Sequence, residues 1–239
     1  MARAKARKTK APQIGQAIPV PTEKQRFEDF LKGFTFKWEC VFDRQGRVIA
    51  EEDPDDPGGV TKYGIDKSAH PNLTADQIRN MTEDEAVEVY FTGEWPASHA
   101  GELPVPLGEI SFNMTVLDGS GRAMRALQSA CGLTGSEVDG AWGPTTLGAA
   151  TAAAKDHDRL MRAADRMLDW RAARYHNLVE EHPKMAKFLK AGSTAPTRFA
   201  SFSKCRTSPK KQILGSNPKK SCTMVRDRGF EPLTPTVSR

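Results

Sequence analysis

Three copies of one helix-start signal constrain the fold of this chain more than any other feature. Thr22 to Gln25, Thr74 to Gln77 and Thr82 to Glu85 each place a threonine three residues before a glutamine or glutamate. In such a capping box, the hydroxyl and the longer side chain satisfy the first free N–H groups of a helix. Apolar residues at helical spacing follow the first and third copies, so the sequence predicts a mainly helical fold.

The predicted helices leave room for one small β element. After the first capping box, an apolar stripe runs from Phe27 to Trp38 and ends beside Glu39. We expect two short strands within residues 41–49, about a turn closed by Gly46, and an extended segment at 60–65. Residues 51–59, rich in Asp, Pro and Gly, predict a polar loop between them. Further helices are expected at 104–117, 122–131, 145–154 and 156–181, with a helical turn after Pro183.

Charge is divided unevenly along the 239 residues. The net charge is +5, yet residues 1–26 hold seven basic residues against one acidic, and residues 191–239 hold ten against two. Residues 27–190 hold 18 basic and 27 acidic residues, a net charge of −9. A basic protein is typical of nucleic-acid or anionic-polymer binding. Here the positive charge belongs to the ends, and the acidic middle carries no recognised nucleic-acid-reading motif, so a nucleic-acid partner is not expected.

Other patterns exclude several classes of protein. No apolar run approaches the roughly 18 residues of a membrane-spanning helix, and the basic N-terminus lacks the apolar segment of a signal peptide. The histidines form no metal-binding motif, and the cysteines lack Cys-x-x-Cys spacing. We therefore expect no metal and no cofactor, synthesis in the cytoplasm without a general secretion signal, and reduced thiols at Cys40, Cys131, Cys205 and Cys222.

One segment combines the groups that glycosidic hydrolysis requires. Glu39 is followed by the loop with Asp53, Asp55 and Asp56, and then by Thr61. The reaction needs one carboxylic acid to protonate the leaving oxygen and a second polar or acidic group on the far side of the sugar. Partial burial of Glu39 between Trp38 and Cys40 would raise its pKa, as a general acid requires. A purely structural interpretation, in which Glu39 caps the helix or forms an ion pair and the Asp-rich loop is solvated, remains open from these residues alone.

Two stretches resemble a known family. Trp38-Glu39 and Asp53-Pro-Asp-Asp-Pro-Gly-Gly-Val-Thr-Lys-Tyr-Gly-Ile65 are similar to the signature of glycoside hydrolase family 108 lysozymes. Residues 112–114, 122–132 and 139–147 resemble the predicted peptidoglycan-binding domain that follows in that family. The resemblance implies a lysozyme-like α+β fold with its hairpin near the active site. It also implies a bacteriolytic, endolysin-like muramidase that cleaves the β-1,4 bond between N-acetylmuramic acid and N-acetylglucosamine in peptidoglycan.

The resemblance also implies catalytic roles. Glu39 aligns with the catalytic glutamate of the family and would be the general acid. By position, Asp56 and Thr61 are the candidates for the second and third catalytic residues, with Asp53 as the substitute for Asp56.

Three residues are candidates for substrate binding, namely Asp53, Tyr63 and Asn113. For Asn113, contact with an N-acetyl group and burial as an amide paired with backbone both remain open.

The predicted domain organisation has four parts. A basic flexible arm covers residues 1–21, a lysozyme-like catalytic segment 22–103 and a helical peptidoglycan-binding segment, packed on it, 104–190. Residues 191–239 are expected to be a disordered tail. Ala191-Gly-Ser-Thr-Ala195 corresponds to an out-of-frame reading of Gly-Trp-Leu-Asn-Arg, a motif that ends members of this family, so the tail is expected to be frameshifted. The alternative is a functional tail that binds anionic wall polymer or nucleic acid.

Two other functions remain as alternatives. Cys40-Val41 replaces the Gly-Gly that follows the glutamate in the family, which keeps open a non-catalytic peptidoglycan-binding protein. Binding of nucleic acid through the basic ends is the other. As a muramidase, the protein is expected to be a monomer that reaches the cell wall after lysis or by specialised export. Whether hydrolysis inverts or retains the anomeric configuration does not follow from the sequence.

Overall fold

The structure is a computed structural model, and it describes residues 20–52 and 59–181. Within these ranges the fold is mainly helical with one small antiparallel sheet, which confirms the predicted α+β class. Among the described helices, none combines the length and apolar character that crossing a bilayer requires. The expectations for the basic arm, for most of the Asp-rich loop, for the turn after Pro183 and for the tail fall outside the described residues.

The first helical segment carries an irregularity that the sequence did not predict. Helix α1 (Glu23–Phe30) begins at the predicted capping box, a π-helical segment (Leu31–Thr35) follows, and α2 (Phe36–Glu39) ends the run. One extra residue in a helical turn rotates everything after it by about 100°. Phe36 is therefore buried, whereas Trp38, the predicted end of the apolar stripe, is half-buried.

The sheet lies later in the chain than predicted. Strands β1 (Thr61–Lys62) and β2 (Ile65–Asp66) pair antiparallel. Tyr63 and Gly64 form the turn between them with φ of 56° and 78°, the positive pair that a type I′ hairpin requires. The two strands expected within residues 41–49 are reduced to a single bridge between Phe42 and Val48, about the predicted turn at Gly46.

The remaining helices follow the predicted order closely. Both later capping boxes are present, at the starts of α3 and α4. The four-residue helix α5, which contains Pro96, was not predicted, because one turn shows no apolar period. The described helices after the sheet are α3 (Ala75–Asn80), α4 (Glu83–Thr92), α5 (Glu94–Ala97), α6 (Leu107–Asp118), α7 (Ser120–Ala130), α8 (Pro144–Ala154) and α9 (His157–Glu181).

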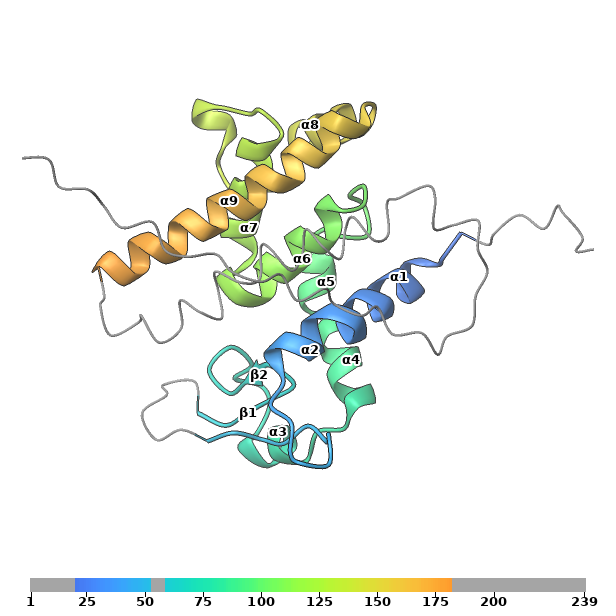
Figure 1. Ribbon diagram of the computed structural model, residues 1–239, viewed down its shortest axis with the longest axis vertical. Coiled ribbons are helices and arrows are strands. Elements are labelled where there is room, and N and C mark those ends of the chain that lie inside the picture. Colours follow the sequence, from blue (N-terminus) through green and yellow to red (C-terminus); the bar gives the residue numbers. More distant parts are fainter. Residues whose placement is uncertain (1–19, 53–58, 182–239) are drawn as a thin grey trace, which may run out of the picture.

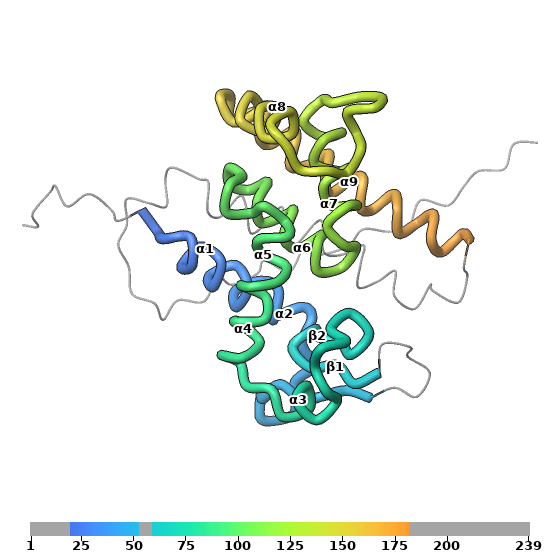
Figure 2. Tube along the Cα trace, turned by 180° about the vertical axis from the view of Figure 1, so that it is seen from behind, coloured from blue at the N-terminus to red at the C-terminus, as the bar shows by residue number. Residues whose placement is uncertain are grey.

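Helix α6 occupies the middle of the molecule. Figures 1 and 2 show the sheet and α3 at one end, α8 at the opposite end, and α6 between them. Phe112 of α6 packs edge-on against aromatic rings from α1, α4 and α5, with centroids 5.4–6.0 Å apart, at Phe27, Phe30, Tyr90 and Trp95. The long helix α9 packs against α6, α7 and α8.

Polar residues of α6 connect it to the helices on both sides. Arg26 of α1 donates two hydrogen bonds to buried Glu109, at 2.7 and 3.0 Å. On the other side, Arg171 of α9 donates to Asn113 at 2.6 Å, and Arg174 pairs with buried Asp118 at 3.2 Å. Because burying a charge is costly unless it is paired, these contacts add to the apolar packing in constraining how α1 and α9 sit on α6.

Candidate active site

Glu39 is the last residue of α2 and its side chain is half-buried. Burial raises the pKa of this carboxyl, and the positive charge of Arg171 partly opposes that rise. The next residue, Cys40, is buried, and burial together with the neighbouring Glu39 carboxylate raises the pKa of its thiol to about 12. The helix end therefore presents a carboxyl that holds its proton to higher pH than a solvated glutamate does.

The turn of the hairpin packs directly against Glu39. A Cβ atom at Gly64 would lie 3.3 Å from the Cβ atom of Glu39 and 2.9 Å from the hydroxyl oxygen of Tyr90. That hydroxyl, on α4, donates a hydrogen bond to the carbonyl oxygen of Tyr63 at 3.0 Å. Only glycine fits this position without displacing a neighbour, so the turn, α4 and the end of α2 are in mutual contact.

Thr61 and Tyr63, two of the predicted site residues, belong to this hairpin. Thr61 is half-buried, and its backbone bonds with Glu51 at 2.8 and 2.9 Å while it pairs with Asp66 on the other side. Tyr63 is also half-buried, and its ring centroid lies 5.2 Å from that of Phe36. The structure thus brings both residues to the strand pair whose turn contacts Glu39.

Two other predicted site residues, Asp53 and Asp56, lie outside the described residues. The flanking residues are described. Glu51 and Thr61 form a bridge, so the residues at the two ends of this loop lie side by side at the hairpin.

Asn113 is buried, with 2% of its surface exposed, and its amide oxygen accepts a hydrogen bond from Arg171. The hydrogen-bond partner of Asn113 is therefore a side chain and not the backbone. The buried amide does not face an open cleft. Arg171 is itself 2% exposed, and its Nε lies 3.9 Å from an oxygen of Asp118. Sequence reasoning missed Arg171 because nothing in an amphipathic helix distinguishes one arginine from the solvated ones beside it.

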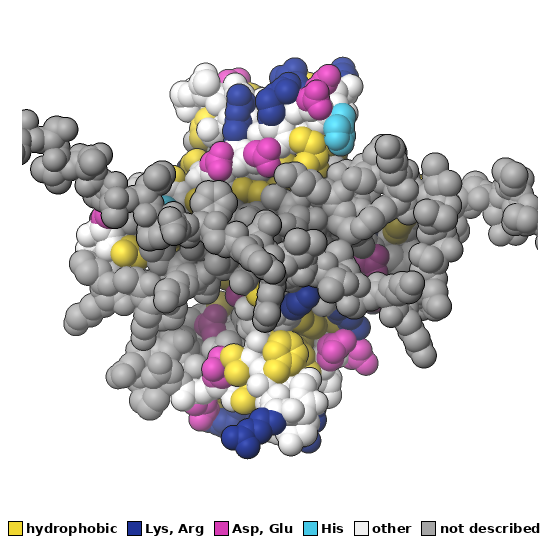
Figure 3. Space-filling model, viewed as in Figure 1, with side chains coloured by type: hydrophobic (Ala, Val, Ile, Leu, Met, Phe, Trp, Pro, Cys, Tyr) yellow, Lys and Arg dark blue, Asp and Glu magenta, His cyan; other side chains and the backbone are white. Residues whose placement is uncertain are grey.

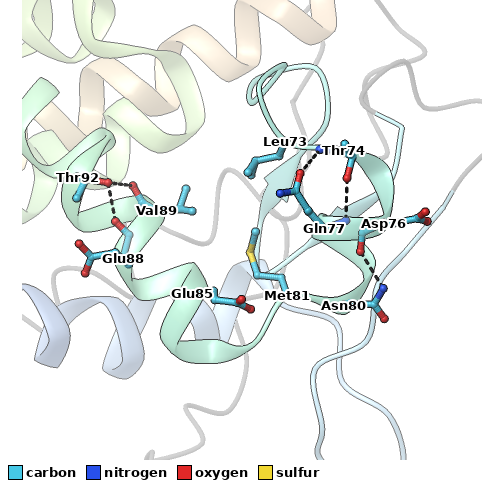
Figure 4. A pocket seen from close by; sticks show the side chains of 10 residues that line it. All are labelled: Leu73, Thr74, Asp76, Gln77, Asn80, Met81, Glu85, Glu88, Val89 and Thr92. Atoms are coloured by element: carbon cyan, nitrogen blue, oxygen red, sulfur yellow. Dashed lines mark hydrogen bonds between the residues drawn. The ribbon is translucent and has the colours of Figure 1, made fainter.

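One hollow among the described residues is lined by residues 73–92 and does not include Glu39. It measures about 640 Å³ and lies between α3 and α4 (Figure 4). Apolar side chains of Leu73, Met81 and Val89 line it, with the carboxylates of Asp76 and Glu85 at its edge. In the described ranges, no group of three or more His, Cys, Asp or Glu side chains is arranged to hold a metal ion.

Charge on the surface is mixed. On the face in Figure 3, basic and acidic side chains are interspersed over the described residues, at both ends of the molecule. Nucleic-acid binding usually requires a continuous basic stripe or patch. The described part of this face shows none.

A mainly helical body, a small sheet and a half-buried glutamate against the turn of that sheet define a lysozyme-like α+β protein. Residues 38–119 match the family model described as Glycosyl hydrolase 108, and residues 122–192 match the Predicted Peptidoglycan domain. The chain thus carries a glycosyl hydrolase 108 domain followed by a predicted peptidoglycan domain, as its signature residues indicated. It is a lysozyme-like glycoside hydrolase that acts on peptidoglycan.

A solved structure supports the fold. The chain is similar to the structure described as "Structure of Brucella abortus SagA", with a TM-score of 0.59 and 22% sequence identity. The match covers 76% of this chain and 95% of that one. No functionally curated protein matches the chain in sequence.

Proposed function

We propose that this enzyme is an N-acetylmuramidase, which hydrolyses the β-1,4 bond between N-acetylmuramic acid and N-acetylglucosamine, with Glu39 as its general acid. The observation that carries the proposal is the environment of Glu39. It is a half-buried carboxyl whose pKa burial raises, held at a helix end by the hairpin turn. Such a group retains a proton for the leaving oxygen at pH values where a solvated glutamate has lost it.

The proposed reaction uses side chains and water. Glu39 donates its proton to the glycosidic oxygen as the bond from that oxygen to the anomeric carbon breaks, and positive charge develops on the sugar. Asp56, or Asp53 in its place, would stabilise that charge or activate water. Thr61 would orient the water. The support for the last two roles is positional, because the segment that holds Asp53 and Asp56 begins and ends beside Thr61.

Substrate contacts are proposed at Tyr63 and Asp53. The Tyr63 ring is half-buried beside Phe36, so one part of it remains available to a sugar. Asn113 is buried, and we propose for it the different role of holding Arg171.

Substitution of Glu39 by glutamine tests the assignment. Loss of a general acid typically reduces the rate by about 10²–10⁴-fold. Purified peptidoglycan is incubated with the wild type and the variant, and new reducing ends are counted. Mass analysis of the reduced products identifies the sugar at the new end, which is N-acetylmuramic acid for a muramidase. Glu102→Gln is the matched control, because Glu102 is an exposed glutamate on the α5–α6 connection. Retention of most activity by Glu39→Gln contradicts the assignment.

A non-catalytic peptidoglycan-binding protein was the main alternative, because Cys40-Val41 replaces Gly-Gly. Cys40 has φ −100° and ψ 145°, an ordinary extended conformation that any residue adopts. Among the described non-glycine residues, only Tyr63 and His99 have positive φ, so Val41 also needs no glycine. The geometry after Glu39 therefore supports the enzyme. Binding to peptidoglycan without any new reducing ends would favour the alternative.

Peptidoglycan lies outside the cytoplasmic membrane. We propose that the enzyme reaches it after lysis or by a specialised export route, and that it acts as a monomer. Sedimentation of the purified protein tests the second point.

A further inference from the structure

A hollow lined by three arginines lies at the start of α9, in the part of the chain that matches the peptidoglycan domain. It measures about 270 Å³. Arg159, Arg162 and Arg166 line it from α9, at a spacing of three and four residues that places them on one face of the helix. The facing wall carries only small side chains from α8 and the end of α7, at Ala130, Cys131, Gly132 and Ala153. One side of the hollow is therefore cationic, and the described residues of the other side include no acidic group.

The three guanidinium groups have no partner within residues 20–52 and 59–181. Aspartates lie beside them on α9, at Asp158 and Asp165, but no ion pair or side-chain hydrogen bond joins any described residue to these three arginines. Three like charges around one hollow repel one another, and an anion held between them would remove that repulsion. The contrast is with the arginines that do pair with a carboxylate, namely Arg26, Arg47, Arg79, Arg171 and Arg174.

Stabilisation of helix ends is the structural alternative for this cluster. Helices α7 and α8 end beside the hollow, and the free carbonyl groups of a helix end attract positive charge. An arginine in that role can donate to such a carbonyl, as Arg122 does to the carbonyl of Asp118 at the end of α6, at 2.9 Å. In the described ranges, Arg159, Arg162 and Arg166 donate to no carbonyl, and all three side chains are exposed. They are therefore available to a ligand.

The charge of the rest of the body gives this cluster its significance. Residues 27–190 carry a net charge of −9. Peptidoglycan is also anionic, because its peptide stems carry carboxylates. The body and the substrate therefore repel each other except where basic groups gather. The start of α9 packs on α8, at the end of the molecule opposite the sheet whose turn contacts Glu39 (Figures 1 and 2).

We propose that the hollow between α7, α8 and α9 is a second site for peptidoglycan, which binds a carboxylate of a peptide stem between the arginine side chains. A guanidinium group can bind a carboxylate through two parallel hydrogen bonds. The glycan strand itself is uncharged where its stems are attached, so the stem supplies the recognised group. The site holds a stem at the end of the enzyme away from Glu39, and the inference does not depend on the role of Glu39. A phosphate group has similar chemistry, and the experiment separates the two.

Co-sedimentation with insoluble peptidoglycan tests the site in the full chain. The parent protein carries Glu39→Gln, so that cleavage is not expected during the measurement. Arg162→Gln removes the middle arginine and is expected to bind about three- to tenfold more weakly. Lys155→Gln is the matched control, because Lys155 is an exposed cation at the end of α8 that does not line the hollow. It should bind as the parent does. The basic ends are the same in every protein, so equal binding by Arg162→Gln and the parent overturns the proposal.

Two treated samples of the same peptidoglycan identify the bound group. Coupling the stem carboxyls to ammonia converts them into neutral amides, and the difference between the parent and Arg162→Gln is expected to vanish. Hydrofluoric acid removes phosphate-linked polymers and should leave that difference intact. A difference that survives amidation, or that disappears with the phosphate, overturns the assignment to a stem carboxylate.

The unfolding temperature separates ligand binding from a helix-end role. Removal of one of three repelling charges should leave the unfolding temperature of Arg162→Gln unchanged or raise it. A lower unfolding temperature with undiminished binding would assign the arginines to the helix ends and overturn the site. Arg166→Gln must repeat the loss of binding, because the site requires the cluster. Reducing ends released by the Glu39→Gln parent would count against the proposed general acid alone, so the two proposals fail by different results.

Discussion

Replacement of Gly64 by alanine tests how the hairpin turn holds Glu39, the proposed general acid. At φ 78°, an alanine costs about 1–2 kcal/mol because its Cβ crowds the backbone in the left-handed conformation. The new Cβ would also lie 2.9 Å from the Tyr90 hydroxyl oxygen and 3.3 Å from the Glu39 Cβ. Displacing the Tyr90 hydroxyl breaks its bond to Tyr63 and leaves a buried polar group unsatisfied, which costs about 1–3 kcal/mol. The expected loss of unfolding free energy is therefore about 2–5 kcal/mol.

Gly46→Ala is a matched control. Gly46 has φ 77°, nearly the same as Gly64, but a Cβ at Gly46 meets no atom within 4 Å. It therefore carries only the backbone cost, about 1–2 kcal/mol. Urea unfolding of both variants gives the difference between them, which is the cost of the close approach at Gly64.

Activity provides the second readout for the same pair. Because the Gly64 contact includes the Cβ of Glu39, Gly64→Ala displaces the glutamate, and its rate of reducing-end release falls well below that of Gly46→Ala at a temperature where both are folded. Equal stability losses in the two variants would show that the contact is not tight. Equal activities would show that the turn does not position Glu39.

Two further predictions concern a half-buried histidine and two buried thiols. His70 bonds to Glu94 at 3.0 Å, and this bond raises the pKa of His70 in the folded protein. The stabilisation is therefore complete below the unfolded value of about 6.5 and is lost as the pH rises through the folded value. Urea unfolding of His70→Gln should show a larger deficit at pH 5.5 than at pH 8.5, and an equal deficit at both would contradict this. Burial raises the thiol pKa values of Cys40 and Cys131 to about 12 and about 11. Peptide mapping after iodoacetamide treatment at pH 8 should find both unmodified in the native protein and modified in urea, and rapid native labelling would refute their burial.

Local signals predicted much of the fold. Each capping box is a contact between residues three apart, so Thr22, Thr74 and Thr82 identified helix starts without any knowledge of packing. The same holds for the Gly46 turn, where glycine alone indicates a positive φ. The placement of Glu39 at a helix end also followed from a local apolar period.

Features that depend on distant contacts were not predictable. Tyr63 takes a left-handed conformation that is unfavourable for an isolated tyrosine, and the Tyr90 hydroxyl, 27 residues away, holds its carbonyl. The sequence around the hairpin at 61–66 therefore predicted only an extended segment. Arg171 was missed for the same reason, because its partners Asn113 and Asp118 lie on α6, far earlier in the chain.

The π-helical segment makes the direction of Glu39 depend on the number of residues before it as well as on their types. The amide of Phe36 bonds to the carbonyl of Leu31, one residue further back than in a regular helix. Removing a single residue between them would restore a regular helix, and Glu39 would swing by about 100° away from the hairpin turn. The number of residues in this segment is therefore constrained, and insertions or deletions are not expected there. Substitutions that keep the helix are tolerable, whereas a one-residue deletion leaves the capping box intact but turns both Glu39 and the buried Phe36 out of their places.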